Sequence, residues 1–318
     1  MECDETLSGG NKLNKQTINV AASISRKLLN LSKERGEANT LVLIRYGLER
    51  FLYRLGRSEY SDSFVLKGAM LFEVWTKKAH RSTKDIDLLG YGEDSGEHLK
   101  SLFQQLGQVE VEPDGLEFDQ ASVRVEEIRE NQEYRGQRVR LNASLERATI
   151  HLQIDIGFGD VITPAAEVIE YPTLLALPAP RIQAYPRDTV VAEKLQTIVS
   201  LGMINSRMKD FYDLWIISRQ FPFEGGLLVD AIKATFKRRG TSIPEGTPIG
   251  LSEEFASNES SGKQWQAFLN RTDMKDDSLD LAEMLDGLQV FLMPPLLAAK
   301  KNEEFAQKWR KGGPWAHE

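Results

Sequence analysis

Two aspartates separated by one residue, Asp85 and Asp87, have the spacing that most directly suggests chemistry. Side chains two positions apart in a strand point to the same side, so both carboxylates would share one face while Ile86 turns to the other. Magnesium prefers hard oxygen ligands and is commonly held by one or two carboxylates together with substrate phosphates. The pair therefore predicts a Mg²⁺ site; the alternative is an acidic edge strand exposed to solvent.

A glycine upstream adds a second feature of a phosphate site. The apolar run 64–66 is followed by Lys67, Gly68 and Ala69, which are expected to open a helix. Glycine lets the backbone approach a phosphate closely, and the first turn of a helix offers free N–H groups to an anion. The segment predicts a phosphate-binding turn beside the aspartates; the alternative is an ordinary turn glycine.

A third carboxylate follows in residues 150–156, which alternate strictly between apolar and polar. Asp155 is expected on the polar side of a half-buried strand together with His151 and Gln153, and Gly157 is expected to end that strand. Three carboxylates from two adjacent strands can hold one or two metal ions. Asp155 would then share a metal or take the proton of an acceptor hydroxyl; otherwise this is a polar strand without a ligand.

Two helices are predicted further along the chain. Asp188 and Thr189 can cap a helix whose apolar positions recur at helical spacing, and Gly202 would end it. Ser206 is expected to cap the second helix.

In this second helix, Arg207, Asp210 and Asp213 follow at intervals of three and would lie along one stripe. The stripe could serve a functional site. It could equally be two ordinary ion pairs, Arg207 with Asp210 and Lys209 with Asp213.

Four motifs together resemble the AbiEii/AbiGii nucleotidyltransferase toxins of the polymerase-β-like nucleotidyltransferase superfamily. The resemblance runs from about residue 18 to about residue 270 and implies an α/β (α+β) fold with a mixed sheet, flanked by N-terminal helices and a helical C-terminal region. The motifs, which occur in the family's order, are 64–71, 81–90, 154–160 and 205–214.

The resemblance also implies roles for individual residues. Lys194 matches a lysine that family members direct at the nucleotide phosphates, and Asp210 matches a functionally required aspartate. Many superfamily members carry Gly-Ser where this chain has Gly68 and Ala69, so backbone amides or neighbouring side chains would have to replace the serine hydroxyl. The expected catalytic residues are Asp85, Asp87, Asp155, Lys194 and Asp210; the metal ligands are Asp85, Asp87 and Asp155; the nucleotide-binding residues are Lys67, Gly68, Ala69, Ser82, Thr83, Lys194 and Arg207.

The implied activity is Mg²⁺-dependent transfer of a nucleoside monophosphate from an NTP to an acceptor hydroxyl. By resemblance the chain would be the toxin of a type IV toxin–antitoxin or phage-defence system. Its antitoxin would be encoded next to it, and transfer RNA is one candidate acceptor. The alternatives are transfer to a small molecule or protein, and a nucleotide-binding interaction module without transfer.

Composition limits the possible partners and compartments. A net charge of −7 disfavours indiscriminate nucleic-acid binding, although local basic groups could grip a structured RNA. The single cysteine, Cys3, excludes an internal disulfide framework. The apolar stretch 288–297 is short and interrupted by Pro294 and Pro295, and no apolar leader is visible, so no membrane segment and a cytoplasmic location are expected. The basic candidates are Arg135, Arg138, Arg140 and Arg147, and Lys237 to Arg239.

The chain is expected to divide into four parts. Helical spacing predicts two helices between residues 18 and 57, and short apolar strands alternate with helices between about 62 and 162. The parts are an N-terminal helical region (1–60), a nucleotidyltransferase core (61–165), a proline-rich connector (166–187) and a helical C-terminal domain (188–318).

Overall fold

The computed structural model describes residues 10–76, 83–131, 134–271 and 279–317, without the side chains of 10–19, 129–131 and 134–135. Ser82 and the side chain of Arg135 thus lie outside the described residues. Contacts divide the chain into two compact units. Unit 1 comprises residues 1–159 and 168–184, and unit 2 comprises residues 160–167 and 185–318. This division follows contacts in space, whereas the predicted four parts follow chain order.

A seven-stranded mixed sheet forms the centre of unit 1, with strand order β3-β4-β5-β2-β1-β7-β6. The pairs β2/β5 and β1/β7 are parallel, whereas β1/β2, β3/β4 and β4/β5 are antiparallel. The predicted mixed α/β fold is therefore confirmed. The strands are β1 (Phe64–Lys67), β2 (Asp85–Gly90), β3 (Leu116–Asn131), β4 (Tyr134–Leu145), β5 (Ala148–Phe158), β6 (Glu167–Glu170) and β7 (Arg181–Ala184).

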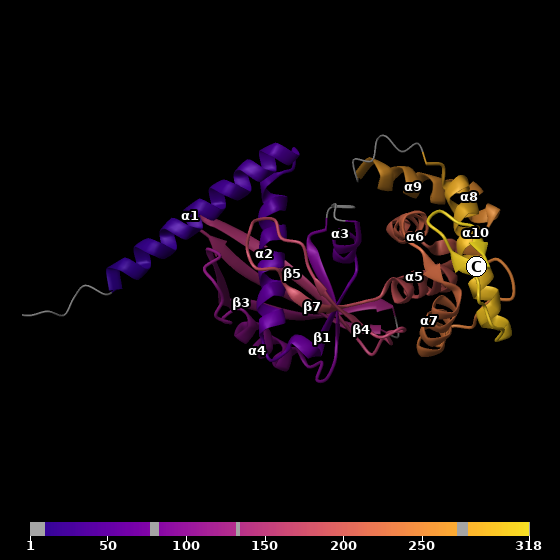
Figure 1. The fold of residues 1–318 in the computed structure, drawn as a ribbon, viewed down its shortest axis with the longest axis horizontal. Helices are drawn as coiled ribbons and strands as arrows, with labels where there is room; N and C mark the ends of the chain where they lie inside the picture. The colour runs from indigo at the N-terminus through magenta and orange to yellow at the C-terminus, as the bar shows by residue number, and fades with distance from the viewer. Residues whose placement is uncertain (1–9, 77–82, 132–133, 272–278, 318) are drawn as a thin grey trace, which may run out of the picture. The chain divides into compact units, whose positions relative to one another are not determined.

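Helix α2 lies across one face of this sheet (Figure 1). A Cβ atom at Gly47 would stand 2.9 Å from Leu152 Cδ2, so the glycine allows the helix to lie close to β5. Phe51 of α2 stacks on Phe103 of α4 at 5.5 Å between ring centroids. This apolar packing buries one face of the sheet and leaves polar residues on the other. The helices of unit 1 are α1 (Gly10–Arg35), α2 (Asn39–Arg57), α3 (Met70–Thr76) and α4 (Gly96–Leu106).

The stretch predicted as a proline-rich connector contributes β6 and β7 to the sheet, and Ala184 pairs with Leu66. Side chains of α2 hold the segment between these two strands. Arg50 Nη2 donates to the carbonyl of Pro178 at 2.7 Å, and Glu49 Oε2 accepts from the amide of Leu174 at 2.7 Å. Hydrogen bonds from α2 thus fix a segment whose prolines alone had suggested only stiffness.

Unit 2 is mainly helical, as predicted, with a small three-stranded sheet of order β10-β9-β8 that the sequence did not reveal. Two-residue strands carry too little periodicity to be read from sequence. The elements are α5 (Arg187–Leu201), α6 (Met208–Gln220), α7 (Gly225–Arg238), α8 (Glu253–Ser257), α9 (Glu259–Arg271), α10 (Leu281–Lys301), β8 (Phe223–Glu224), β9 (Lys308–Trp309) and β10 (Trp315–Ala316).

Helix α10 corrects the expectation that prolines interrupt the late apolar stretch. Pro294 and Pro295 lie inside one continuous helix of 21 residues. Among the described helices, α10 alone is long and apolar enough to cross a membrane by length and composition, and half of its apolar window is buried within the protein. Its Leu288, Phe291 and Leu292 are fully buried, which is the packing of a core helix.

Candidate functional site

The two faces of β2 separate as the sequence predicted. Ile86 and Leu88 are fully buried, whereas Asp85 and Asp87 occupy the alternate positions and are half-buried. Thr83 Oγ1 donates to Asp85 Oδ1 at 2.9 Å, which orients the first carboxylate. The two aspartates therefore share the polar face of the sheet.

Four charged residues lie in register across adjacent strands of this face. Lys67 of β1 is opposite Asp87 of β2, Asp87 is opposite Asp155 of β5, and Asp155 is opposite Arg138 of β4. Residues directly opposite each other in a sheet project from the same face. We call Arg138, Asp155, Asp87 and Lys67 the cross-strand row. It places two carboxylates between two cations.

Gly68 is required at its position for two reasons. Its φ of +75° is unfavourable for side chains other than glycine, and a Cβ atom there would stand 1.9 Å from Asp87 Oδ2. Helix α3 begins at Met70, so Gly68 lies in the turn before the helix instead of opening it as predicted. The bare backbone of this turn lies directly beside the second carboxylate.

Asp155 makes a two-point ion pair with Arg138. Nε of Arg138 donates to Oδ1 at 2.8 Å and Nη2 donates to Oδ2 at 2.7 Å, while Gln153 Nε2 approaches Oδ2 at 3.4 Å. The hydrogen bonds between Arg138 and Asp155 raise the pKa of Arg138, and the negative charges of Asp155 and Asp85 act in the same direction. Both oxygens of Asp155 are thus engaged by a cation.

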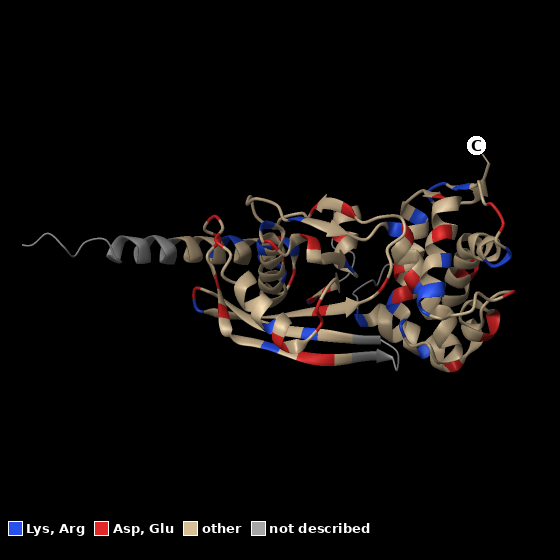
Figure 2. Cartoon of the chain, turned by 90° about the horizontal axis from the view of Figure 1, so that it is seen from below, with Lys and Arg blue, Asp and Glu red and all other residues tan. Residues whose placement is uncertain are grey.

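Two of the arginines predicted as an RNA-binding cluster, Arg138 and Arg140, are paired with acids. Arg138 binds Asp155, and Arg140 Nη1 contacts both oxygens of Glu126 at 2.6 Å. Basic and acidic residues also lie interspersed along the described strands and helices (Figure 2). At Arg138 and Arg140, the positive charge that the sequence suggested is offset by cross-strand partners.

Lys67 lies close to a glycine that the sequence interpretation assigned to a strand end. Strand β5 continues to Phe158, so Gly157 lies within it, because pairing with neighbouring strands outweighs the low strand propensity of glycine. A Cβ atom at Gly157 would stand 3.2 Å from Lys67 Nζ. The missing side chain therefore leaves room for the ammonium group over the polar face.

The polar face fits a divalent cation held by two carboxylates and substrate oxygens. Asp85 and Asp87 share the face beside the Gly68 turn, which supplies the hard oxygen ligands that Mg²⁺ prefers. Within the described ranges, no three His, Cys, Asp or Glu side chains gather closely enough to form a metal site by themselves. Asp155 could act as a third ligand only by sharing its carboxylate with Arg138 or releasing it.

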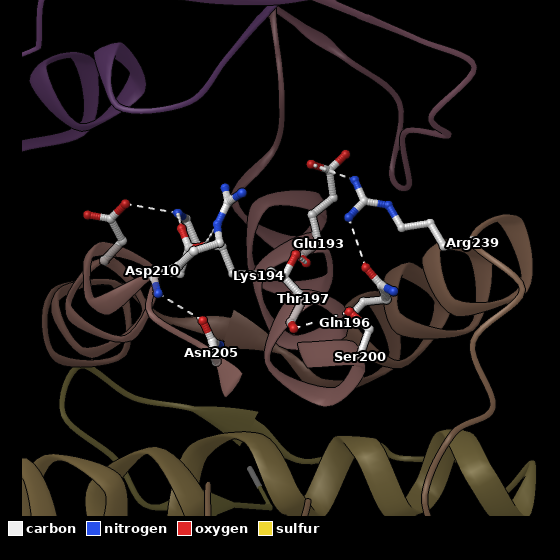
Figure 3. A network of polar contacts seen from close by, with 10 residues as sticks. Glu193, Lys194, Gln196, Thr197, Ser200, Asn205, Asp210 and Arg239 are labelled. Atoms are coloured by element: carbon white, nitrogen blue, oxygen red, sulfur yellow. Dashed lines mark hydrogen bonds and ion pairs between the residues drawn. The ribbon is translucent and has the colours of Figure 1, made fainter. Parts of the chain in front are cut away.

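A second polar cluster surrounds Lys194 of α5 in unit 2 (Figure 3). Its ammonium group donates to Asp210 Oδ1 at 2.6 Å and to Asp213 Oδ2 at 2.9 Å, and Arg207 Nε donates to Asp210 Oδ2 at 2.7 Å. Burial by itself would raise the pKa of Asp210, but the charges of Lys194 and Arg207 outweigh burial and hold the pKa below its usual value. Two cations and two nearly fully buried carboxylates balance one another here.

These contacts decide between the local ion pairs predicted from sequence. The pair of Arg207 with Asp210 is confirmed, whereas Asp213 contacts Lys194 from another helix, where Lys209 had been expected. Helix α6 begins at Met208 and its first turn is joined by Asn205, whose side chain accepts from the amide of Arg207 at 2.9 Å. The predicted cap at Ser206 is therefore wrong.

The start of α5 also differs from the prediction, because the helix begins at Arg187 after Pro186. Thr189 lies inside the first turn, and its hydroxyl donates to the carbonyl of Thr163 at 2.8 Å. Burial raises the pKa of Asp188 to about 6. Thr189 thus joins the start of α5 to the segment around Thr163.

A third cluster escaped the sequence interpretation. Arg239 had been assigned to a basic surface patch, but its guanidinium is largely buried and contacts Asp160 at 3.1 Å, Glu193 at 3.2 Å and Gln196 Oε1 at 2.9 Å (Figure 3). Its partners come from distant parts of the chain, so local patterns carry no signal of them.

The predicted site residues thus gather in two sets, one within each unit. Asp85, Asp87, Asp155, Lys67 and Gly68 lie together on the sheet of unit 1, with Ala69 buried behind the turn. The second set, in unit 2, consists of Lys194, Arg207 and Asp210.

A model of the family described as "Nucleotidyl transferase AbiEii toxin, Type IV TA system" matches residues 50–289. No curated protein matches the sequence significantly. A crystal structure of an H. pylori protein provisionally described as a nucleotidyltransferase is 13% identical over 80% of this chain and 95% of its own, with a TM-score of 0.45. The structure of JHP933 from Helicobacter pylori is 14% identical over 80% and 90%, with a TM-score of 0.43.

Proposed function

Because the chain belongs to the AbiEii nucleotidyl transferase toxin family of type IV toxin–antitoxin systems, we propose that it transfers a nucleoside monophosphate from an NTP to an acceptor hydroxyl, with Mg²⁺ as its metal. The chain is a nucleotidyltransferase, and its family pairs such toxins with an antitoxin. The observation that carries the proposal is the polar face of β2 and β5, where Asp87 and Asp155 lie in register beside the Gly68 turn.

In the proposed reaction, the oxygen of the acceptor hydroxyl attacks the α-phosphorus of the NTP. The bond from that phosphorus to the bridging oxygen breaks, and pyrophosphate leaves with the electron pair. Asp85 and Asp87 would hold one or two divalent ions, which neutralise the charge on the phosphates. Asp155 would share an ion or receive the proton of the hydroxyl.

Cations of the chain would bind the triphosphate. Lys67 would contribute from the polar face of the sheet, where Gly157 leaves it room. Lys194 and Arg207, within unit 2, are proposed as phosphate-binding residues in their own right, because lysine acts as a point charge and arginine can make two-point contacts. Thr83 already donates to Asp85, so its role would be to orient the carboxylate.

The proposed acceptor is a structured RNA, with transfer RNA as the first candidate. The toxin family supports an acceptor whose modification harms the cell, and a small-molecule or protein hydroxyl is the alternative. The antitoxin would be the product of a neighbouring gene. The packing of α10 as a core helix supports a cytoplasmic protein.

The experiment incubates the protein with an NTP labelled at the α-phosphate and either cell extract or purified transfer RNA. Transfer of label is expected for the wild type and is expected to be lost in Asp87→Asn, because this change removes charge that the cation requires. Gln120→Glu, on the exposed end of β3, is the control for an unrelated charge change. Labelling by Asp87→Asn at the wild-type rate, with an unchanged melting temperature, would refute the assignment.

A further inference from the structure

Arg138, at one end of the cross-strand row, engages the carboxylate that a third metal contact would need. Its Nε and Nη2 atoms bind the two oxygens of Asp155 at 2.8 and 2.7 Å. Asp155 lies in register with Asp87, the next carboxylate of the row. Arginine and a divalent cation therefore have the same target.

Both cations cannot easily occupy this carboxylate together. The side chains of Arg138 and Asp155 are 29% and 17% exposed, so water screens the pair only partly. A divalent ion on Asp155 would stand a few ångströms from the guanidinium, and like charges repel strongly at that distance in a partly buried site. Binding of the ion should displace the arginine.

A displaced guanidinium would find a second partner in the same place. Its planar fork matches a phosphate as well as it matches a carboxylate, through two parallel hydrogen bonds. The substrate of the proposed function carries a triphosphate. With Lys67 at the other end, the cross-strand row then offers the phosphates a cation on either side of Asp155 and Asp87.

We propose that Arg138 is a nucleotide-binding residue that is held on Asp155 until a divalent cation takes the carboxylate, and that then turns to a phosphate of the NTP. The proposal rests on the proposed function. It assigns to Asp155 two alternating partners, Arg138 before the ion binds and the ion afterwards. It also replaces the earlier assignment of Arg138 to an RNA-binding cluster.

Arg140 provides a matched control on the same strand. It lies two residues from Arg138, on the same face, and forms an exposed ion pair with Glu126. Its removal eliminates the same charge a short distance away without touching Asp155. A difference between the two arginine variants therefore reports on the contact with Asp155 and not on net charge.

The first measurement is the affinity for Mn²⁺ in the absence of nucleotide, determined by titration calorimetry. Arg138→Gln is expected to bind Mn²⁺ roughly tenfold more tightly, since the ion no longer displaces a charge-assisted pair. Arg140→Gln should stay within about twofold of the wild type because an exposed pair contributes little. Asp155→Asn should bind the ion more weakly than the wild type.

The second measurement is NTP affinity in Ca²⁺, which limits turnover. Arg138→Gln is expected to bind NTP at least roughly tenfold more weakly, because one charged contact to phosphate is lost. The two affinities of one variant should therefore move in opposite directions. A residue with only a structural role would move both the same way or neither.

Arg138→Lys separates the effect of charge from that of the two-point contact. It also replaces Arg138→Gln in the Mn²⁺ titration if Arg138→Gln does not fold. Lysine keeps the charge but cannot make the fork, so Mn²⁺ should bind more tightly than in the wild type. Unchanged or weaker Mn²⁺ binding in both Arg138 variants would overturn the proposal, as would unchanged binding in Asp155→Asn. Failure of the wild type to transfer label would refute the proposed function separately, because neither titration requires transfer.

Discussion

At the scale of single residues, Gly68 shows how a small side chain can set the position of a functional one. We expect Gly68→Ala to destabilise the protein by about 1–2 kcal/mol, the usual cost of a left-handed conformation for a side chain other than glycine. Because the new methyl group would overlap Asp87 Oδ2, transfer activity should fall by more than this loss of stability explains. Urea unfolding and labelled transfer, measured on the same preparations, test this.

Gly92 offers the comparison for Gly68→Ala. Its φ of +94° imposes a similar backbone strain, but no atom lies within 4 Å of a Cβ there. Gly92→Ala should therefore lose stability and keep its activity. Equal activity in the two variants would show that the carboxylate of Asp87 tolerates displacement.

Lys194 is expected to matter for stability as well as for nucleotide binding. Lys194→Met removes a cation that lies 2.9 Å from Asp213, whose side chain is 1% exposed, and removing one partner of a buried pair typically costs about 3–5 kcal/mol. Arg207 still contacts Asp210, so we expect a loss near the lower end. Lys209→Met, at an exposed position of α6, should change the free energy of unfolding by less than about 0.5 kcal/mol.

Lys194→Met should also change the pH dependence of the free energy of unfolding. The pKa of Asp210 is lowered in the folded protein, so its stabilising contribution is present above the unfolded value of 3.8 and is lost as the pH falls further through the folded value. In Lys194→Met, the charge of Lys194 no longer counteracts the burial of Asp210. Protonation of the Asp210 carboxylate then relieves the cost of burying its negative charge. The stability deficit of the variant should therefore be full at neutral pH and shrink in acid; a constant deficit would contradict the ion-pair assignment.

At the scale of elements, two glycines in helices should respond in opposite ways to the same substitution. In Gly287→Ala of α10, the new methyl group would stand 2.2 Å from Trp215 Cζ3. Such overpacking costs about 1–3 kcal/mol and exceeds the roughly 1 kcal/mol that alanine contributes to a helix. In α9, a Cβ at Gly262 meets nothing within 4 Å, so Gly262→Ala should stabilise the protein by about 0.5–1 kcal/mol. Thermal unfolding of both variants decides this, and a stable Gly287→Ala would mean that the ring of Trp215 moves at little cost.

The strands that hold the site could be read from the sequence because their alternation is local. Residues 150–156 predicted a strand with Asp155 on its polar face, and β5 has that pattern. Pairing across strands could not be read in this way. The contact of Arg138 with Asp155 joins residues 17 positions apart, and only the register of β4 on β5 brings them together.

Helix boundaries and buried charge clusters were the weakest predictions, for the same physical reason. The start of α5 depended on a tertiary partner, because the hydroxyl of Thr189 donates to the carbonyl of Thr163, 26 positions away. Arg239 looked like a surface residue because basic runs usually are, and its partner Asp160 lies 79 positions away. Local propensity contains none of these contacts.

At the scale of the whole molecule, the division into units predicts which fragments can fold. A fragment of residues 1–159 lacks β6 and β7, so β1 loses a neighbour, and Glu49 and Arg50, both 1% exposed, lose their contacts to Leu174 and Pro178. Residues 1–184 retain all seven strands. We expect cooperative urea unfolding, measured by circular dichroism, for the fragment 1–184 only. A shared midpoint for the two fragments would show that β6 and β7 contribute little to unit 1.

The path of the chain between the units has a consequence for inheritance. The chain passes from one unit to the other after Gly159, Glu167 and Ala184. A single exchange between two related genes after codon 159 would combine five strands of one parent's sheet with two of the other's, and one after codon 184 would set Asp160 of one parent against Arg239 of the other. One crossover therefore cannot exchange either unit as a whole. The sheet with its carboxylates and the helices around Lys194 should be inherited together as one gene.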